Sequence, residues 1–176
     1  WLRDVRAAHR WALDFLLDEV LSRRSEADQE LLMRTSVLDR ISADLAAALS
    51  EDPEARVRLE TLAHDGLFLL PADTRGEWFR YHSLFAEVLR LRLGRLRPGL
   101  EPRLRRLAAE ALEARGDLEA AVEQRLAVGD SRDAARLVES VAEVMLGRGE
   151  IHAFLSWTDR IPAEFLAERP GLVVRR

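Results

Sequence analysis

The spacing of apolar residues changes abruptly at His82, and this change constrains the fold more than any other feature of the sequence. Residues 77–81 form an aromatic, strand-like run, whereas residues 82–93 have the apolar spacing of an amphipathic helix. Upstream, the apolar residues 67–70 and the turn-rich residues 71–76 predict a first strand and a tight connection. The sequence therefore predicts a β-hairpin that leads directly into a helix.

Four helices are predicted on the amino-terminal side of this hairpin. Apolar spacing indicates helices over residues 12–24 and 39–49. Between them, Ser25 precedes acidic residues, as is typical of a helix N-cap, and Asp52-Pro53 favours the start of the fourth helix. The apolar residues that the last three of these helices would bury are Leu31, Leu32, Ile41, Leu45, Ala48, Val57, Leu59 and Leu62. Helices followed by a hairpin and a closing helix predict a winged-helix-like domain with a short β-hairpin.

A break in the helical pattern divides the chain. Residues 97–102 hold two prolines and a glycine, which cannot extend a helix. We therefore expect two domains, with the winged-helix-like domain in residues 1–97 and a helical arm in residues 98–176.

The helical arm is predicted to consist of paired helices. Glycine-containing breaks at residues 116–117, 129–130 and 147–149 separate four apolar stripes of helical spacing, and Val144 and Ile151 belong to the last two. The outer breaks are about 33 residues apart, close to the period of tetratricopeptide (TPR) repeats. The fold class is thus predicted as mainly α, with TPR-like antiparallel helical hairpins following the winged-helix-like domain.

Composition excludes several classes of function. All 27 basic residues are arginine, so the lysine that a Walker-type phosphate loop needs is missing from this chain. The net charge of −4 argues against broad contact with a phosphate backbone. The absence of cysteine excludes disulfides and cysteine-ligated zinc, and no apolar run approaches the length of a membrane span. We expect a cytoplasmic protein without membrane contact.

No catalytic or metal-binding constellation is found. The four histidines are far apart and lack the His-x-x-x-His spacing that places two ligands on one helix face, so no metal site is expected. A Gly-x-Ser-x-Gly nucleophile elbow is also missing from the sequence. We therefore predict no catalytic residues and no enzymatic activity in this chain.

His82 is the strongest candidate for a functional residue. The first turn of a helix offers free backbone N–H groups and a partial positive charge, which suit an anion such as a phosphate. An imidazole at that position can add one more hydrogen-bond donor. The alternative is that His82 only caps the helix or packs against the hairpin.

Two stretches of the sequence resemble a known family. They are residues 31–40, Leu-Leu-Met-Arg-Thr-Ser-Val-Leu-Asp-Arg, and residues 66–70 together with 78–85, Trp-Phe-Arg-Tyr-His-Ser-Leu-Phe. The sequence of residues 13–93 resembles the large ATP-dependent, LuxR-type bacterial transcription regulators of the MalT-like, or maltose-activator, type. These belong to the signal-transduction ATPases with numerous domains (STAND class).

The resemblance implies a role for this segment in signal transmission. A complete protein would carry an ATPase domain upstream, further helical repeats downstream and a helix-turn-helix DNA reader, and it would be a slow switch ATPase. Its cofactors would be ADP or ATP with Mg²⁺, none of them held by this segment alone. By position, His82 would contact the β-phosphate of ADP, and Arg80 and Tyr81 would flank it. Many relatives have a second histidine at the position of Ser83.

The resemblance and the residues leave other functions open. The partners implied are the adjoining ATPase domain, later helical repeats, and an inducer ligand or regulatory protein on the helical arm. A protein–protein interaction scaffold built from residues 103–161 is a second hypothesis. Direct DNA contact is not expected, because acidic residues outnumber Arg56 and Arg58 around the helix that follows Pro53. The aromatic residues of 78–85 are expected to pack in the core rather than stack on bases.

Overall fold

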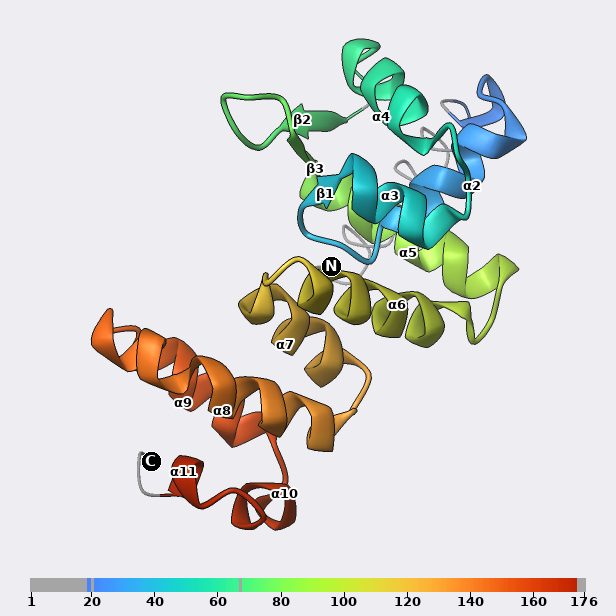
Figure 1. Cartoon of the computed structure of the whole chain (residues 1–176). Coiled ribbons are helices and arrows are strands. Elements are labelled where there is room, and N and C mark those ends of the chain that lie inside the picture. Colours follow the sequence, from blue (N-terminus) through green and yellow to red (C-terminus); the bar gives the residue numbers. More distant parts are fainter. Residues whose placement is uncertain (1–18, 20, 67, 174–176) are drawn as a thin grey trace, which may run out of the picture. The chain divides into compact units, whose positions relative to one another are not determined.

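The computed structural model describes residues 19, 21–66 and 68–173 and shows a mainly helical protein with one small sheet (Figure 1). Two compact units are present, residues 1–104 and residues 105–176, and the division falls within helix α6 (Leu100–Ala114). The domain boundary that the sequence places at residues 97/98 stays a prediction. Most of the helix predicted over residues 12–24 lies outside the described residues.

In the described part of the first unit, α2 (Glu26–Thr35) begins where its capping residue predicted. Ser25 Oγ accepts a hydrogen bond from the Asp28 backbone N at 3.1 Å, which satisfies one of the free N–H groups of the first turn. Leu31 and Leu32 are buried, which confirms the predicted inner face of this helix.

The predicted hairpin is present, but it belongs to a three-stranded antiparallel sheet. Strand β3 (Trp78–Tyr81) lies between β2 (Leu69–Pro71) and β1 (Ile41–Ser42). The prediction of a helix over residues 39–49 was therefore wrong at its start, because residues 41–42 pair with β3. Ser42 Oγ then accepts from the Leu45 backbone N at 3.4 Å and caps α3 (Ala43–Ser50), which packs on α2.

Two further predictions about the first unit need correction. Ala48 is exposed, since the buried stripe of α3 runs through Leu45, Ala46 and Leu49. In α4 (Ala55–His64) the buried residues Ala55, Leu59 and Leu62 recur at helical spacing. Val57 lies off that stripe and is 63% exposed.

The helical pattern is interrupted over fewer residues than predicted. Helix α5 (Ser83–Leu96) closes the first unit, and α6 resumes at Leu100 after Gly99, so Pro102 lies within the first turn of α6. Proline is tolerated there because the first N–H groups of a helix have no intrahelical acceptor.

The four helices predicted for the helical arm are present, and two short helices follow them within the described residues. After α6 come α7 (Leu118–Ala127), α8 (Ser131–Gly147) and α9 (Ile151–Arg160), and then α10 (Ala163–Ala167) and α11 (Pro170–Val173). Helix α8 contacts α7, α9, α10 and α11, so it forms the centre of this unit. Whether the helix pairs are TPR-like stays a prediction.

Apolar side chains at the α8–α9 connection are more exposed than predicted. Val144 is 53% exposed in the last turn of α8, and Ile151 is 52% exposed at the first residue of α9. The core of this pair contains Val138 and Met145 of α8 and Phe154 of α9. Over the described residues, no helix is long and apolar enough to cross a membrane.

Candidate functional site

His82 lies at the start of α5, where the sequence predicted it, and its backbone is held on both sides. The residue is the N-cap, with φ −58° and ψ 135°. Its N–H donates to the Phe68 carbonyl oxygen at 2.8 Å, and its carbonyl oxygen accepts from the Ala86 N–H at 3.0 Å. The backbone of His82 is therefore held by Phe68, just before β2, and by the first turn of α5.

The imidazole of His82, in contrast, is exposed and makes no capping hydrogen bond to α5. No acidic residue lies in the first turn of that helix, so no carboxylate there competes for its partial positive charge. An exposed imidazole beside the N-terminus of a 14-residue helix can donate to an anion that approaches from outside this unit.

Arg80, the other predicted site residue, lies on the same side of the strand end as His82. Phe79 and Tyr81 are buried in β3, whereas Arg80 between them is exposed. Side chains two residues apart on extended backbone point to the same face, and His82 is still extended. The exposed side chains of Arg80 and His82 thus lie on the same face of the backbone where β3 leads into α5.

Tyr81 is buried and forms a hydrogen-bond chain with α2. Its hydroxyl lies 2.7 Å from Thr35 Oγ1, which itself donates to the Leu31 carbonyl oxygen at 2.7 Å. Because the Thr35 proton is used in that bond, the Tyr81 hydroxyl is the donor. Burial raises the pKa of Tyr81 well above its ordinary value, so the phenol stays protonated.

Aromatic rings fill the space behind this hydrogen-bond chain. The Phe85 ring is stacked on Phe68 with centroids 5.1 Å apart and tilted against Tyr81 at 5.7 Å. Phe79, Tyr81 and Phe85 are buried, as predicted for a packing role. Trp78 is only partly buried and lies under the Arg40 guanidinium, whose carbon is 4.7 Å from the ring centroid.

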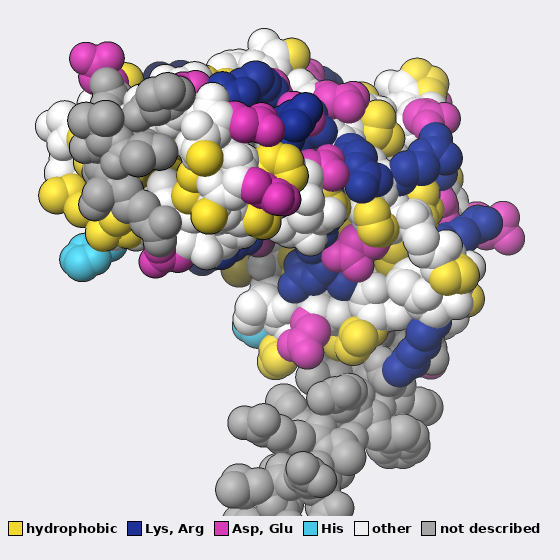
Figure 2. All heavy atoms as spheres, turned by 90° about the horizontal axis from the view of Figure 1, so that it is seen from below, with side chains coloured by type: hydrophobic (Ala, Val, Ile, Leu, Met, Phe, Trp, Pro, Cys, Tyr) yellow, Lys and Arg dark blue, Asp and Glu magenta, His cyan; other side chains and the backbone are white. Residues whose placement is uncertain are grey.

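The arginines of α4 are engaged by neighbouring carboxylates. Arg58 contacts Asp52 at 2.8 Å, Glu54 at 2.9 Å and Asp28 at 3.3 Å. Arg56 lies within 4 Å of Asp44 and Glu60. On the face that Figure 2 displays, basic and acidic side chains alternate among the described residues. Neither feature resembles the basic stripe of a nucleic-acid-binding surface.

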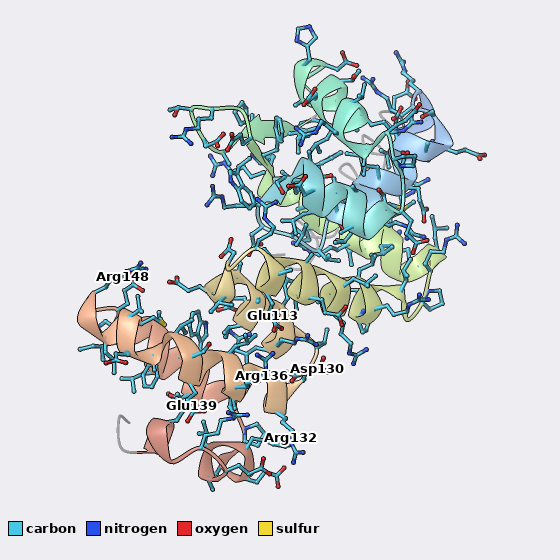
Figure 3. All side chains as sticks on the ribbon, viewed as in Figure 1. Glu113, Asp130, Arg132, Arg136, Glu139 and Arg148 are labelled. Carbon is cyan, nitrogen blue, oxygen red and sulfur yellow. The ribbon has the colours of Figure 1, made fainter. Side chains whose placement is uncertain are left out.

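A second cluster of charges, which the sequence analysis missed, lies in the helical unit (Figure 3). Arg125 of α7 is only 8% exposed, and its guanidinium contacts Glu113 of α6 at 3.2 Å and Asp130 before α8 at 3.4 Å. Glu113 also binds Arg136 of α8 at 2.7 Å, and Asp130 binds Arg106 of α6 at 3.0 Å. These ion pairs, which we call the Arg125 cluster, connect three helices.

The Arg125 cluster predicts acid sensitivity of the helical unit. Burial raises the pKa of Glu113, but hydrogen bonds from Arg136 and Arg125 outweigh it, and the net pKa is lowered from 4.5. A lowered pKa contributes stability above the ordinary pKa that is lost as the pH falls through the folded-state pKa. Unfolding free energies measured from about pH 6 to about pH 3 should fall less steeply in Glu113→Gln than in the wild type. Glu143→Gln, which changes an exposed carboxylate on α8, should keep the wild-type slope.

In the part of the chain that the structure describes, no group of three or more His, Cys, Asp or Glu side chains is arranged to hold a metal ion.

Comparison with known proteins agrees with this architecture. Residues 17–101 match the family model described as the MalT winged helix domain. Over 173 residues the chain is 30% identical to the HTH-type transcriptional regulator MalT of Klebsiella pneumoniae (strain 342). The aligned region covers 98% of this chain but only 19% of that protein, so the chain spans about a fifth of the length of this curated relative. The predicted resemblance is thus confirmed: residues 17–101 are a winged helix domain of the MalT type, and the chain as a whole is similar to a segment of the MalT regulator.

Proposed function

We propose that this chain is the switch segment of an ATP-dependent transcription regulator. In this proposal the winged helix domain senses whether ADP or ATP occupies an ATPase domain of the same protein. It then passes that state to the helical unit, which acts as the start of a sensor arm. The observation that carries the proposal is the exposed imidazole of His82, held at a helix N-terminus by two backbone hydrogen bonds.

The chemistry of this site suits a phosphate better than a neutral or cationic ligand. The partial positive charge of the α5 N-terminus, the His82 imidazole and the adjacent Arg80 all favour an anion. The backbone of His82 is preorganised while its ring remains available. Little conformational freedom would therefore be lost when it binds a phosphate of a neighbouring domain.

The energy of one such contact is sufficient for a switch. A charge-assisted hydrogen bond contributes roughly 1.5–3 kcal/mol, which corresponds to about tenfold or more in an equilibrium constant. If His82 binds ADP only in the closed state, ADP stabilises that state by this difference. ATP together with an inducer would favour the open state, in which the contact is lost.

Further roles follow from the same proposal. The parent protein would be a cytoplasmic, slow switch ATPase with ADP or ATP and Mg²⁺ as cofactors, whereas this segment would carry no catalytic residue. Its partners would be the ATPase domain, later helical repeats and an inducer or regulatory protein on the helical arm. The engagement of Arg56 and Arg58 by carboxylates supports the view that α4 does not read DNA.

The test is His82→Ala in the full-length regulator. We expect ADP affinity, measured by calorimetric titration, to fall about tenfold, because one charge-assisted hydrogen bond is lost. Inducer-free transcription should rise, because the closed state loses its link to ADP. His64→Ala, which removes another exposed histidine of the winged helix domain, is the matched control and should change neither quantity. Unchanged ADP affinity and basal transcription in His82→Ala would refute the proposal.

A protein–protein interaction scaffold is the second candidate function. The observation that favours it is the exposure of Val144 and Ile151 near the α8–α9 connection, where large apolar side chains could contact a partner. Equal ADP affinities of wild type and His82→Ala would favour this scaffold function over the nucleotide switch.

A further inference from the structure

We propose that Thr35 and Tyr81 are positioning residues for His82, acting through the buried hydrogen bond that joins the end of α2 to the last residue of β3. The inference rests on the proposed function of His82 and extends it to two residues that cannot touch the nucleotide themselves. Thr35 is fully buried and Tyr81 is 7% exposed, so neither side chain is available to an external ligand.

Tyr81 is covalently linked to His82, the next residue in the chain. The Tyr81 hydroxyl donates to Thr35 Oγ1 at 2.7 Å, across 46 residues of sequence. The phenol ring is long and rigid, so fixing its hydroxyl also limits rotation of β3 about its own axis. The outward direction of His82, the next residue, is thereby defined relative to α2.

The same end of α2 is also hydrogen-bonded to α5, at a residue beyond His82. Arg90 Nη1 donates to the Ser36 carbonyl oxygen at 2.8 Å. The residues before and after His82 are therefore both anchored at Thr35–Ser36. The backbone bond from His82 N–H to the Phe68 carbonyl oxygen at 2.8 Å adds a third constraint from the strand side.

A hydrogen bond from His82 to a phosphate requires a precisely placed imidazole. A single hydrogen bond to a phosphate depends steeply on donor distance and angle, so a small displacement of the imidazole weakens it strongly. The His82 side chain has no capping bond to α5 that would orient it. Its orientation must come from the backbone and its neighbours, which makes the Thr35–Tyr81 bond functionally relevant.

The experiment is a double-mutant cycle in the full-length regulator, with calorimetric titration of ADP as the readout. Tyr81→Phe removes only the hydroxyl and leaves the Thr35 bond to Leu31 intact, so the fold should be retained. We expect it to weaken ADP binding about three- to tenfold in the wild-type background and to have no further effect in His82→Ala. Thr35→Val should behave in the same way, and Thr35→Ser, which keeps the hydroxyl, should restore affinity.

The control is Ser50→Ala, which removes a partly buried hydroxyl bond to the Ala46 carbonyl oxygen at 2.6 Å at the end of α3. It should leave ADP affinity unchanged although it also removes a hydroxyl bond of the same unit. The inference is overturned if Tyr81→Phe reduces affinity equally with and without His82, or no more than Ser50→Ala does. If His82→Ala itself leaves affinity unchanged, the proposed function fails, and the positioning role fails with it.

Discussion

Replacement of Arg125 by methionine is expected to lower the free energy of unfolding of the helical unit by about 2–4 kcal/mol. Arg125 is 8% exposed and its guanidinium neutralises Glu113 and Asp130, so its removal leaves carboxylates inside a helix interface with fewer partners. Methionine fills most of the vacated volume, which separates the electrostatic loss from the cost of a cavity. Hydrogen exchange of α6, α7 and α8 measures the loss within this unit.

Arg148→Met provides the matched control for that prediction. Arg148 pairs with Glu119 at 3.4 Å, but both side chains are about half exposed, at 60% and 47%. Exposed ion pairs contribute about 0–1 kcal/mol, so this variant should be close to wild type. Equal losses in the two variants would mean that Arg125 acts through general surface charge and not as the centre of a buried cluster.

The Arg125 cluster also shows where sequence reasoning reaches its limit. Helical spacing correctly predicted α6 to α9, because apolar residues that recur along a helix mark its buried face. Arg125 is an exception because its partners come from two other helices, 12 residues before it at Glu113 and five residues after it at Asp130. Spacing along one helix does not reveal which polar residue will face a neighbouring helix.

The winged helix domain shows the same contrast between local and distant signals. The cap at Ser25 and the helix start at His82 were predictable, since both depend on residues close in sequence. Strand β1 is only two residues long, and its pairing with β3 depends on residues far away in the chain. The Thr35–Tyr81 bond spans 46 residues and could not be foreseen from either segment.

The second large effect is expected at Phe85, where replacement by alanine should lower the free energy of unfolding of the winged helix domain by about 3–5 kcal/mol. The Phe85 side chain is 6% exposed and contacts both Tyr81 and Phe68. Its removal leaves a cavity behind the start of α5, and the surrounding rings can collapse only partly. Urea denaturation measures the change in the free energy of unfolding, and hydrogen exchange of the α2 and α5 amides shows that the loss lies in this domain.

Phe68→Ala is the control, because it removes the stacked ring at 5.1 Å from a side chain that is already 49% exposed. We expect a loss of about 0.5–1.5 kcal/mol, the typical value of an aromatic pair without full burial. A comparable loss in both variants would indicate that stacking, and not burial of Phe85, stabilises this region. The distinction matters for His82, since Phe68 holds its backbone through a carbonyl oxygen that the substitution retains, whereas the Phe85 ring packs directly against the Tyr81 ring.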